Sequence, residues 1–210
     1  MRVNVRSHSL EANMTQTGDL RRRELLVAAG GCFARKGFHQ TSIADICTAA
    51  GMSPGSLYRY FRSKDEIIRA MVEDERRDSA AVVESLVGQA DLVAGLEAIF
   101  EDALGSFAEA GTNAMHAEVT AEALRNPDIA VLVRASDEAI RTALTDVIRQ
   151  AQKAKAIDYS LAPEVTAELL MALLDGLWWR QAMQPDADPK RHTPTLAVLL
   201  RRLLRPGQSA

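Results

Sequence analysis

The chain of 210 residues is poor in the side chains that support disulfide chemistry or membrane insertion. It contains two cysteines, Cys32 and Cys47. Both fall on apolar stripes of predicted helices, which favours buried thiols over a redox pair. Charged residues break every apolar stretch well short of the ~18 residues that a membrane span needs. No secretory signal or lipidation motif is present, so we expect a cytoplasmic protein with no membrane partner.

Catalytic and metal-binding patterns are also missing. Gly30-Gly31 does not belong to a strand-to-helix phosphate loop, and no serine has an evident base beside it. His116, Glu118 and Glu122 lie close in sequence, but only the two glutamates are four residues apart on one helical face. We therefore expect no catalytic residue, no metal and no cofactor, and we interpret the chain as a protein that is not an enzyme.

Helical periodicity is what the chain does have, and it predicts an all-α fold of about nine helices with no convincing strand. Residues 1–18 are polar and aperiodic and predict a flexible N-terminal arm. The helices are predicted over about residues 19–36, 42–51, 54–60, 63–86, 91–109, 112–124, 127–155 and 163–183, and from residue 193 onward. Since N-cap and proline signals open most of these segments, their starts are better defined than their ends.

Residues 41–64 predict two short helices joined by a tight turn. Ser42 with Asp45 three residues later forms a capping box, and Gly51 ends this first helix. Ser53 is an N-cap and Pro54 stands at the first position of the next helix. This is the layout of a helix-turn-helix, in which the first helix braces a second that enters the major groove of DNA. The alternative is an ordinary helical hairpin whose tyrosines face a core.

The charge distribution supports the interpretation of this segment as a DNA-binding head. Residues 19–64 carry eight Lys/Arg and three Asp/Glu, a balance of +5, whereas residues 65–210 carry 15 and 24, a balance of −9. A basic head on an acidic body puts positive potential where phosphates would lie. The boundary at residue 64 also divides the predicted head, 19–64, from a predicted body, 65–210.

The same region resembles a known family. The elements F-A-x-x-G-F, T-S-I-x-D-I, A-G-M-S-P-G-S-L-Y-x-Y-F and K-x-E-I occur in order over residues 19–70, as in the N-terminal domain of the TetR (tetracycline-repressor) family of transcription regulators. Leu57 and Phe61 are one turn apart on the other face, which predicts that they pack as core behind the recognition helix. The DNA-contacting residues are then expected to be Thr41, Ser42, Ser53, Pro54, Gly55, Ser56, Tyr58, Arg59, Tyr60 and Lys64.

The last two predicted helices carry more apolar surface than one core needs. The segment 163–183 is apolar on nearly every side, which predicts one face for its own domain and one for a second copy. The alternative is that a monomer covers both faces. The segment MALLDGLWWRQAM is similar to the BetI-like C-terminal type of the family, whose members pair through their last two helices. The expected homodimer interface comprises Leu170, Leu174, Leu177, Leu196, Leu200 and Leu203.

The body is a plausible place for a small-molecule effector, although each candidate residue could equally be packed core. Met115 has the adaptable side chain of an apolar pocket, and His116 would supply one polar anchor. The full set of expected pocket residues is Phe100, Leu104, Phe107, Met115, His116, Val119, Trp178 and Trp179.

The sequence thus predicts a homodimeric repressor that binds a palindromic double-stranded operator. By the resemblance, a small molecule enters the body, the fourth helix pivots and DNA is released. A regulator that activates, or that needs no ligand, is an alternative within the class. A helical small-molecule-binding module or enzyme without sequence-specific DNA binding is the alternative outside it.

Overall fold

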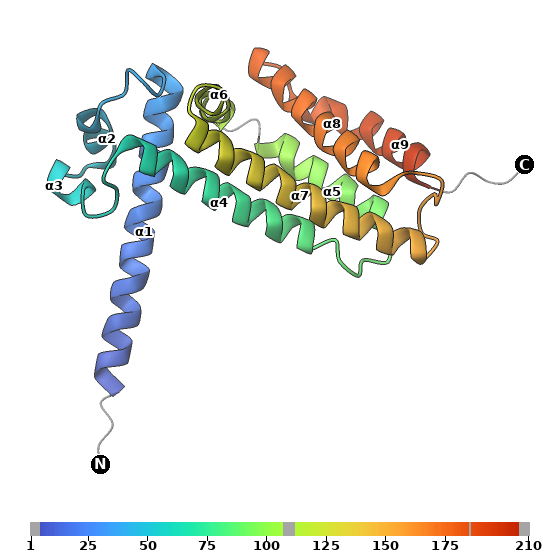
Figure 1. Ribbon diagram of the computed structural model, residues 1–210, viewed down its shortest axis with the longest axis horizontal. Helices are drawn as coiled ribbons and strands as arrows, with labels where there is room; N and C mark the ends of the chain where they lie inside the picture. Colours follow the sequence, from blue (N-terminus) through green and yellow to red (C-terminus); the bar gives the residue numbers. More distant parts are fainter. Residues whose placement is uncertain (1–4, 107–111, 185, 206–210) are drawn as a thin grey trace, which may run out of the picture. The chain divides into compact units, whose positions relative to one another are not determined.

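The computed structural model describes residues 5–106, 112–184 and 186–205, with side chains from residue 18 in the first segment and from residue 115 in the second. Over these ranges the chain is all-α, with no strand, as the periodicity predicts (Figure 1). The elements are α1 Val5–Lys36, α2 Ile43–Ala50, α3 Pro54–Leu57, α4 Lys64–Glu84, α5 Leu92–Ser106, α6 Thr112–Ala123, α7 Pro127–Lys153, α8 Pro163–Met183, the 3₁₀ segment η1 Pro189–His192, and α9 Thr193–Leu204.

The chain divides into two compact units, a first unit that extends to Met71 and a second unit that begins at Val72. The division falls inside α4, so the first two turns of this helix belong to the first unit. Ile67 and Ile68 in those turns are buried. The charge distribution predicts the boundary at residue 64 instead. It depends on charged side chains only, so it does not include the buried apolar residues that hold the start of α4 in the first unit.

The first helix is longer than predicted. It begins at Val5 rather than near Asp19, so the expected flexible arm over residues 1–18 is helical from residue 5 onward. Polar sequence without apolar periodicity gives no amphipathic signal, yet no proline interrupts this stretch. Once the packed part of a helix is formed, each added residue propagates it at little cost. Periodicity therefore detects only the buried part, where Leu25, Ala29 and Phe33 face the core of the first unit.

The core of the second unit is built from α5, α7, α8 and α9. Leu196, Leu200 and Leu204 recur at four-residue spacing on α9 and are all buried in it. On the rim, Arg201 makes a bidentate ion pair with Glu97, with both N–O distances at 2.6 Å, and so links α9 to α5. Such bidentate pairing favours one geometry at the contact between the two helices.

Among the described helices, none combines the length and the unbroken apolar character that crossing a bilayer requires. The helices instead alternate buried and exposed faces, as helices of a packed protein do.

Candidate nucleic-acid interface

The bracing helix α2 begins with the predicted capping box. The amide of Asp45 donates to Ser42 Oγ over 3.1 Å, and the Asp45 carboxylate accepts from the amide of Ser42 over 2.9 Å. Lys36 Nζ lies 2.6 Å from Asp45 Oδ1. That ammonium, together with the Ser42 donors, holds the pKa of the Asp45 carboxyl well below its usual range. Gly51 ends the helix with φ 62°, a left-handed conformation that glycine adopts at no steric cost.

The next helix, α3, is short and capped as predicted. Ser53 Oγ accepts from the amide of Ser56 over 3.2 Å, and Pro54 stands at its first position. The helix ends at Leu57 rather than near Tyr60, and the following residues form hydrogen-bonded turns, including Tyr60 N to Leu57 O at 2.9 Å. The segment is therefore a tight turn of helix followed by a compact turn.

Two apolar side chains fix α3 to the first unit. Leu57 is fully buried and Phe61 is 3% exposed, which confirms their predicted place in the core. Arg22 of α1 lies over the Phe61 ring, with its guanidinium carbon 5.5 Å from the ring centroid. Sequence reasoning missed this cation–π contact, since nothing in the spacing connects residue 22 with residue 61.

The opposite side of α3 is open to solvent. Pro54, Gly55 and Arg59 are exposed, and Tyr58 is 52% exposed. Ser56 and Tyr60 are half-buried at its margin. The local fold thus brings small residues, hydroxyls and one guanidinium onto one accessible face, which suits close approach to base edges and phosphates.

Thr41 does not present its hydroxyl to solvent, contrary to the expected phosphate contact. It is 1% exposed, and Thr41 Oγ1 donates towards the carbonyl oxygens of Gly37 at 2.8 Å and Cys32 at 3.2 Å. The physical reason is the tight loop between α1 and α2, which folds Thr41 back against carbonyl oxygens near the end of α1. Ser42 next to it is exposed, although its hydroxyl already donates to Asp45.

Lys64 is also engaged within the first unit. Its ammonium donates to the carbonyl oxygens of Phe38 at 2.7 Å and His39 at 3.2 Å, and lies 4.7 Å from the Phe38 ring centroid. The residue is half-buried. A lysine ammonium has three donors, so these contacts leave at most one N–H for a phosphate. In this structure Lys64 chiefly fastens the start of α4 to the loop between α1 and α2.

The N-terminal cap of α4 is only half of a capping box. The amide of Glu66 donates to Ser63 Oγ over 3.1 Å. The Glu66 carboxylate, however, accepts from the amide of Arg62 rather than from that of Ser63. The reciprocal bond is therefore shifted by one residue, and α4 begins at Lys64.

The expected pocket residues of the second unit have several different environments. Phe100, Leu104 and Val119 are buried, the first two as members of the core. Met115, His116 and Trp178 are half-buried, and Trp179 is 56% exposed. Phe107 lies outside the described residues. The predicted set therefore has no common environment in this structure, and the pocket stays a prediction, because the periodicity that places residues on helices does not separate core from cavity.

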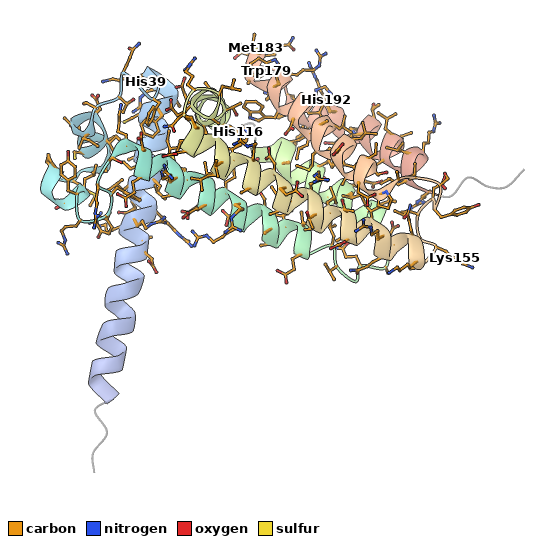
Figure 2. The ribbon with its side chains drawn as sticks, viewed as in Figure 1. His39, His116, Lys155, Trp179, Met183 and His192 are labelled. Carbon is orange, nitrogen blue, oxygen red and sulfur yellow. The ribbon has the colours of Figure 1, made fainter. Side chains whose placement is uncertain are left out.

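Among the half-buried residues of the predicted pocket, His116 is the polar one. Its Nδ1 lies 3.2 Å from Glu75 Oε1 on α4, and its ring lies 4.6 Å from the Trp178 ring on α8, centroid to centroid. The Glu75 carboxylate raises the pKa of His116 against the opposing effect of burial. The carboxylates of Asp137 and Asp175 act in the same direction as Glu75. Figure 2 labels His116 beside α6, and Trp179 and Met183 at the end of α8.

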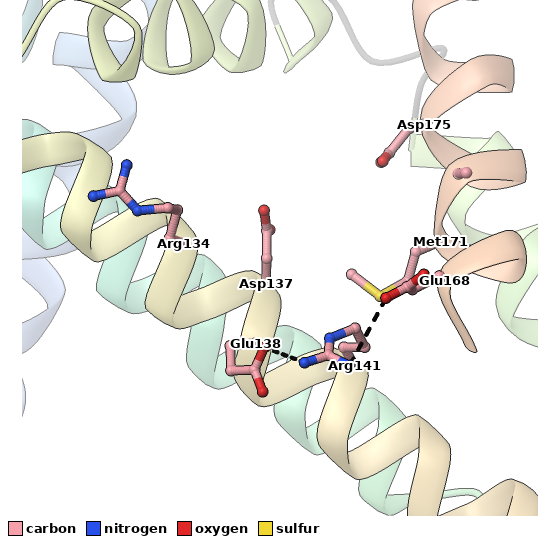
Figure 3. Close-up of a pocket in the computed structure, with 8 residues that line it drawn as sticks. Arg134, Asp137, Glu138, Arg141, Glu168, Met171 and Asp175 are labelled. Atoms are coloured by element: carbon pink, nitrogen blue, oxygen red, sulfur yellow. Dashed lines mark hydrogen bonds and ion pairs between the residues drawn. The ribbon is translucent and has the colours of Figure 1, made fainter. Parts of the chain in front are cut away.

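A groove between α7 and α8, lined mostly by charged residues, lies beside His116, and sequence reasoning missed it. Its volume is about 340 Å³. Asp137 and Asp175 extend from the two helices toward the same space in Figure 3, and burial raises the pKa of both carboxyls. The lining residues are Arg134, Asp137, Glu138, Arg141, Glu168, Met171, Ala172 and Asp175. Charges on separate helices give no common sequence pattern, so only the packing of α7 on α8 reveals the groove.

Three residues of the expected dimer interface lie inside the second unit instead. Leu170, Leu196 and Leu200 are 2%, 5% and 1% exposed and belong to its core, so they are not free to contact a second copy. Leu174 and Leu177 are half-buried, and Leu203 is 46% exposed. The helix signal was right, but α8 and α9 turn these faces toward α5 and α7 rather than outward.

Each of the two helices also has a different face that is exposed and apolar. Along α8 the exposed positions 165, 169, 172, 176, 179 and 183 repeat at alternating spacings of four and three residues. Ala172 and Gly176 in the middle of this face are small, and a Cβ added to Gly176 would meet open space. We call the following set the outer stripe: Val165, Leu169, Ala172, Gly176, Trp179 and Met183 of α8, with Val198, Leu199 and Leu203 of α9.

The comparisons with known proteins agree with this architecture. Residues 25–71 match the model of the family described as bacterial regulatory proteins, tetR family. Residues 89–205 match the model described as BetI-type transcriptional repressor, C-terminal. The two matches cover the helix-turn-helix and most of the second unit.

Individual relatives span most of the chain as well. The HTH-type transcriptional regulator UidR of Escherichia coli strain K12 is 30% identical over 166 residues, which cover 79% of this chain and 83% of UidR. The solved structure of Salmonella enterica GusR has 29% identity and a TM-score of 0.73, and covers 88% of this chain and 95% of GusR. FadR of Bacillus subtilis, solved in complex with stearoyl-CoA, shares the fold at 16% identity with a TM-score of 0.74. The match covers 85% of this chain and 96% of FadR.

Proposed function

Since the chain belongs to the TetR family of bacterial regulatory proteins and is a DNA-binding transcription regulator, we propose that it is a repressor that binds a palindromic operator as a homodimer. A small molecule bound in the second unit releases it from DNA. The operator and the repressor meet in the cytoplasm. The observation that carries the proposal is the exposed face of α3, which is capped by Ser53 and anchored from behind by buried Leu57 and Phe61.

The DNA-contacting set follows from exposure. Gly55 and Ser56 allow the backbone of α3 to approach base edges, and Arg59 is the residue best placed to read a base. Tyr58 and Tyr60 supply phenol hydroxyls to phosphates, and the exposed Ser42 hydroxyl turns from Asp45 to a phosphate oxygen at the start of α2. Ser53 and Pro54 set the first turn of α3. Thr41 leaves the set because it is buried, and Lys64 contributes mainly by holding the loop before α2.

The homodimer forms through the outer stripe. Its four-three spacing on α8 matches the seam of two helices that pack at a small crossing angle, and the small residues Ala172 and Gly176 permit a close approach. Exposed apolar surface of this extent is a liability on a monomer and is covered in an assembly. Two-fold symmetry of the protein then requires a palindromic operator, with half-sites one helical turn, ~34–36 Å, or a small multiple apart.

The effector binds in the second unit near His116 and Trp178. These side chains offer an aromatic face and a polar group, and the groove lined by Asp137 and Asp175 lies on the adjoining helices. The stearoyl-CoA complex of FadR supports the idea that a body of this fold can hold a small molecule. The residues that line the site in this chain are its own, so we do not propose stearoyl-CoA as its effector.

The test is a mobility-shift titration of the purified protein against the DNA upstream of its own gene, over a salt series and with non-specific competitor. We expect specific binding of a dimer whose affinity falls steeply with salt, because phosphate contacts release counterions. Arg59→Ala is the matched variant that should weaken binding without unfolding the first unit. Weak binding that is equal on all sequences, with the same affinity in Arg59→Ala, would favour a helical binding module instead.

A further inference from the structure

His116 on α6 is the point where three other helices of the second unit meet. Its Nδ1 pairs with Glu75 Oε1 of α4 at 3.2 Å. Its ring packs at 4.6 Å on Trp178 of α8, with an angle of 47° between the planes. The carboxylate of Asp137 on α7 also acts on its charge. One imidazole therefore links α4 to α6 and α8.

The charges around this imidazole are all of one sign. Glu75 faces it from α4, Asp137 from α7 and Asp175 from α8. Over residues 5–106, 112–184 and 186–205, no hydrogen bond or ion pair reaches the carboxylate of Asp137 or Asp175. With a proton on His116 this cluster holds one cation, and without it the cluster holds none. The proton on His116 thus decides whether three negative side chains repel one another or share a counter-charge.

We propose that His116 is a proton-linked latch that fastens α4 to α6 and α8 through Glu75 and Trp178, and that opening this latch changes operator affinity. The inference rests on the proposed repressor function. His116 is a positioning residue in it, since the contact acts on the helix and not on DNA.

Glu75 is what connects the latch to the DNA-binding unit. It lies on α4, one continuous helix from Lys64 to Glu84, whose first two turns belong to the first unit. Lys64 at the other end of this helix holds the loop before α2. A constraint on α4 at Glu75 is therefore a constraint on the element that starts beside the candidate DNA interface. By linkage, if protonation changes DNA affinity, DNA binding changes the proton affinity of His116 by the same factor.

The sign follows from the geometry. The pKa of His116 is raised above its ordinary value of 6.5, first by the hydrogen bond to Glu75 and in opposition to burial. The latch is consequently closed at pH below 6.5 and opens as pH rises through the raised pKa. Around its midpoint the contact is an equilibrium between closed and open forms, and there a small perturbation moves it most.

The first measurement is the pKa of His116 by NMR titration of the full-length dimer. The sequence has four histidines, so loss of one resonance in His116→Gln assigns the signal. In Glu75→Gln, which keeps the shape and an acceptor but removes the charge, we expect the His116 pKa to fall toward its ordinary value. An unchanged pKa in Glu75→Gln overturns the latch, whatever the protein does on DNA.

The second measurement is operator affinity from about pH 6 to about pH 8 at constant ionic strength. In the unaltered protein we expect a change of about fivefold or more, the lower end of the coupling common between linked sites. His116→Gln and Glu75→Gln should each remove this dependence, and the double variant should add nothing further. His192→Gln, a half-buried histidine of η1, is the matched control and should retain the full dependence.

The outcomes separate the two ideas. If neither the unaltered protein nor any variant binds the operator specifically, the proposed function is wrong. The NMR titration then still tests the contact between His116 and Glu75. If binding is specific but the pH profiles of the unaltered protein and Glu75→Gln coincide, the repressor stands and the latch is rejected. If the variants lose operator affinity equally at every pH and keep the pH dependence, His116 and Glu75 have only a structural role. That result also rejects the latch.

Discussion

Lys36 and Asp45 tie the end of α1 to the start of α2, with Lys36 Nζ 2.6 Å from Asp45 Oδ1. The same carboxylate completes the capping box with Ser42. One half-buried acid therefore serves as helix cap, dipole partner and ion-pair acceptor. The orientation of α2, which braces α3, depends on this junction.

This junction predicts an acid-sensitive first unit. The pKa of Asp45 is depressed, so its stabilising contribution is present above the ordinary value of 3.8 and is lost as pH falls through the lower folded value. In Asp45→Asn we expect a lower melting temperature at neutral pH and a flatter dependence on acid. The measurement is thermal unfolding from about pH 7 to about pH 2. Parallel curves for the two proteins would contradict the assignment.

The caps of the two short helices are expected to dominate local stability. Ser42→Ala and Ser53→Ala each remove a hydroxyl that accepts from a helix amide, and each should cost about 1 kcal/mol of unfolding free energy. Thr48→Ala is the control, because its hydroxyl bonds to the Ala44 carbonyl within α2 and caps nothing. Urea unfolding at neutral pH compares the three. Equal losses of unfolding free energy in all three variants would show that the two caps contribute no more than an ordinary side-chain hydrogen bond.

Arg59 and Lys64 should separate DNA affinity from stability. Arg59→Ala should leave the unfolding free energy within about 0.5 kcal/mol, since it is exposed, and should weaken operator binding by about 1–3 kcal/mol if it reads a base. Lys64→Ala should instead cost about 1.5 kcal/mol of stability by removing its bonds to the Phe38 and His39 carbonyls.

The comparison requires both measurements on both variants, urea unfolding and mobility shift on the same preparations. A stable Lys64→Ala protein that loses affinity equally on all sequences would restore Lys64 as a phosphate contact. A stable Arg59→Ala protein with undiminished affinity would remove Arg59 from the interface.

The outer stripe predicts which charges break the dimer. Leu169→Glu or Leu199→Glu places a carboxylate on the exposed apolar face, and we expect a folded monomer at micromolar concentration because a buried charge without a partner is costly. Sedimentation velocity measures the assembly state and circular dichroism the fold. A dimer that survives both substitutions would move the interface elsewhere.

Leu200→Ala serves as the contrasting variant. Leu200 is 1% exposed inside the core, so its truncation should cost about 2–5 kcal/mol of unfolding free energy and act on the fold of each subunit. If Leu200→Ala is instead as stable as the unaltered chain but monomeric, the assignment of Leu200 to the core is wrong.

Local signals predicted much of the DNA-binding region. The cap at Ser42, the cap at Ser53, the stop at Gly51 and the buried positions of Leu57 and Phe61 were all readable from neighbouring residues. Each depends on hydrogen bonds or periodicity within about one turn, so one segment of sequence contains all the information. The length of α1 was not readable, because a polar helix carries no such period.

Local sequence signals did not predict contacts between residues that are far apart in the chain. Thr41 and Lys64 looked like phosphate ligands until the structure placed the carbonyls of the loop between α1 and α2 within their reach. Leucines of α8 and α9 looked alike in sequence, and only the position of α5 and α7 divided them into core and outer stripe. Burial depends on which helices meet, and no local pattern encodes that.

The sequence by itself determined the all-α class, the two capped helices and the family to which the chain belongs, since these depend on short-range chemistry and on ordered motifs. Tertiary structure alone decided that His116 pairs with Glu75 and stacks on Trp178, that Asp137 and Asp175 face one groove, and that Leu199 rather than Leu200 is exposed. Those relations join residues that are dozens of positions apart, and only packing of whole helices against one another fixes such distances.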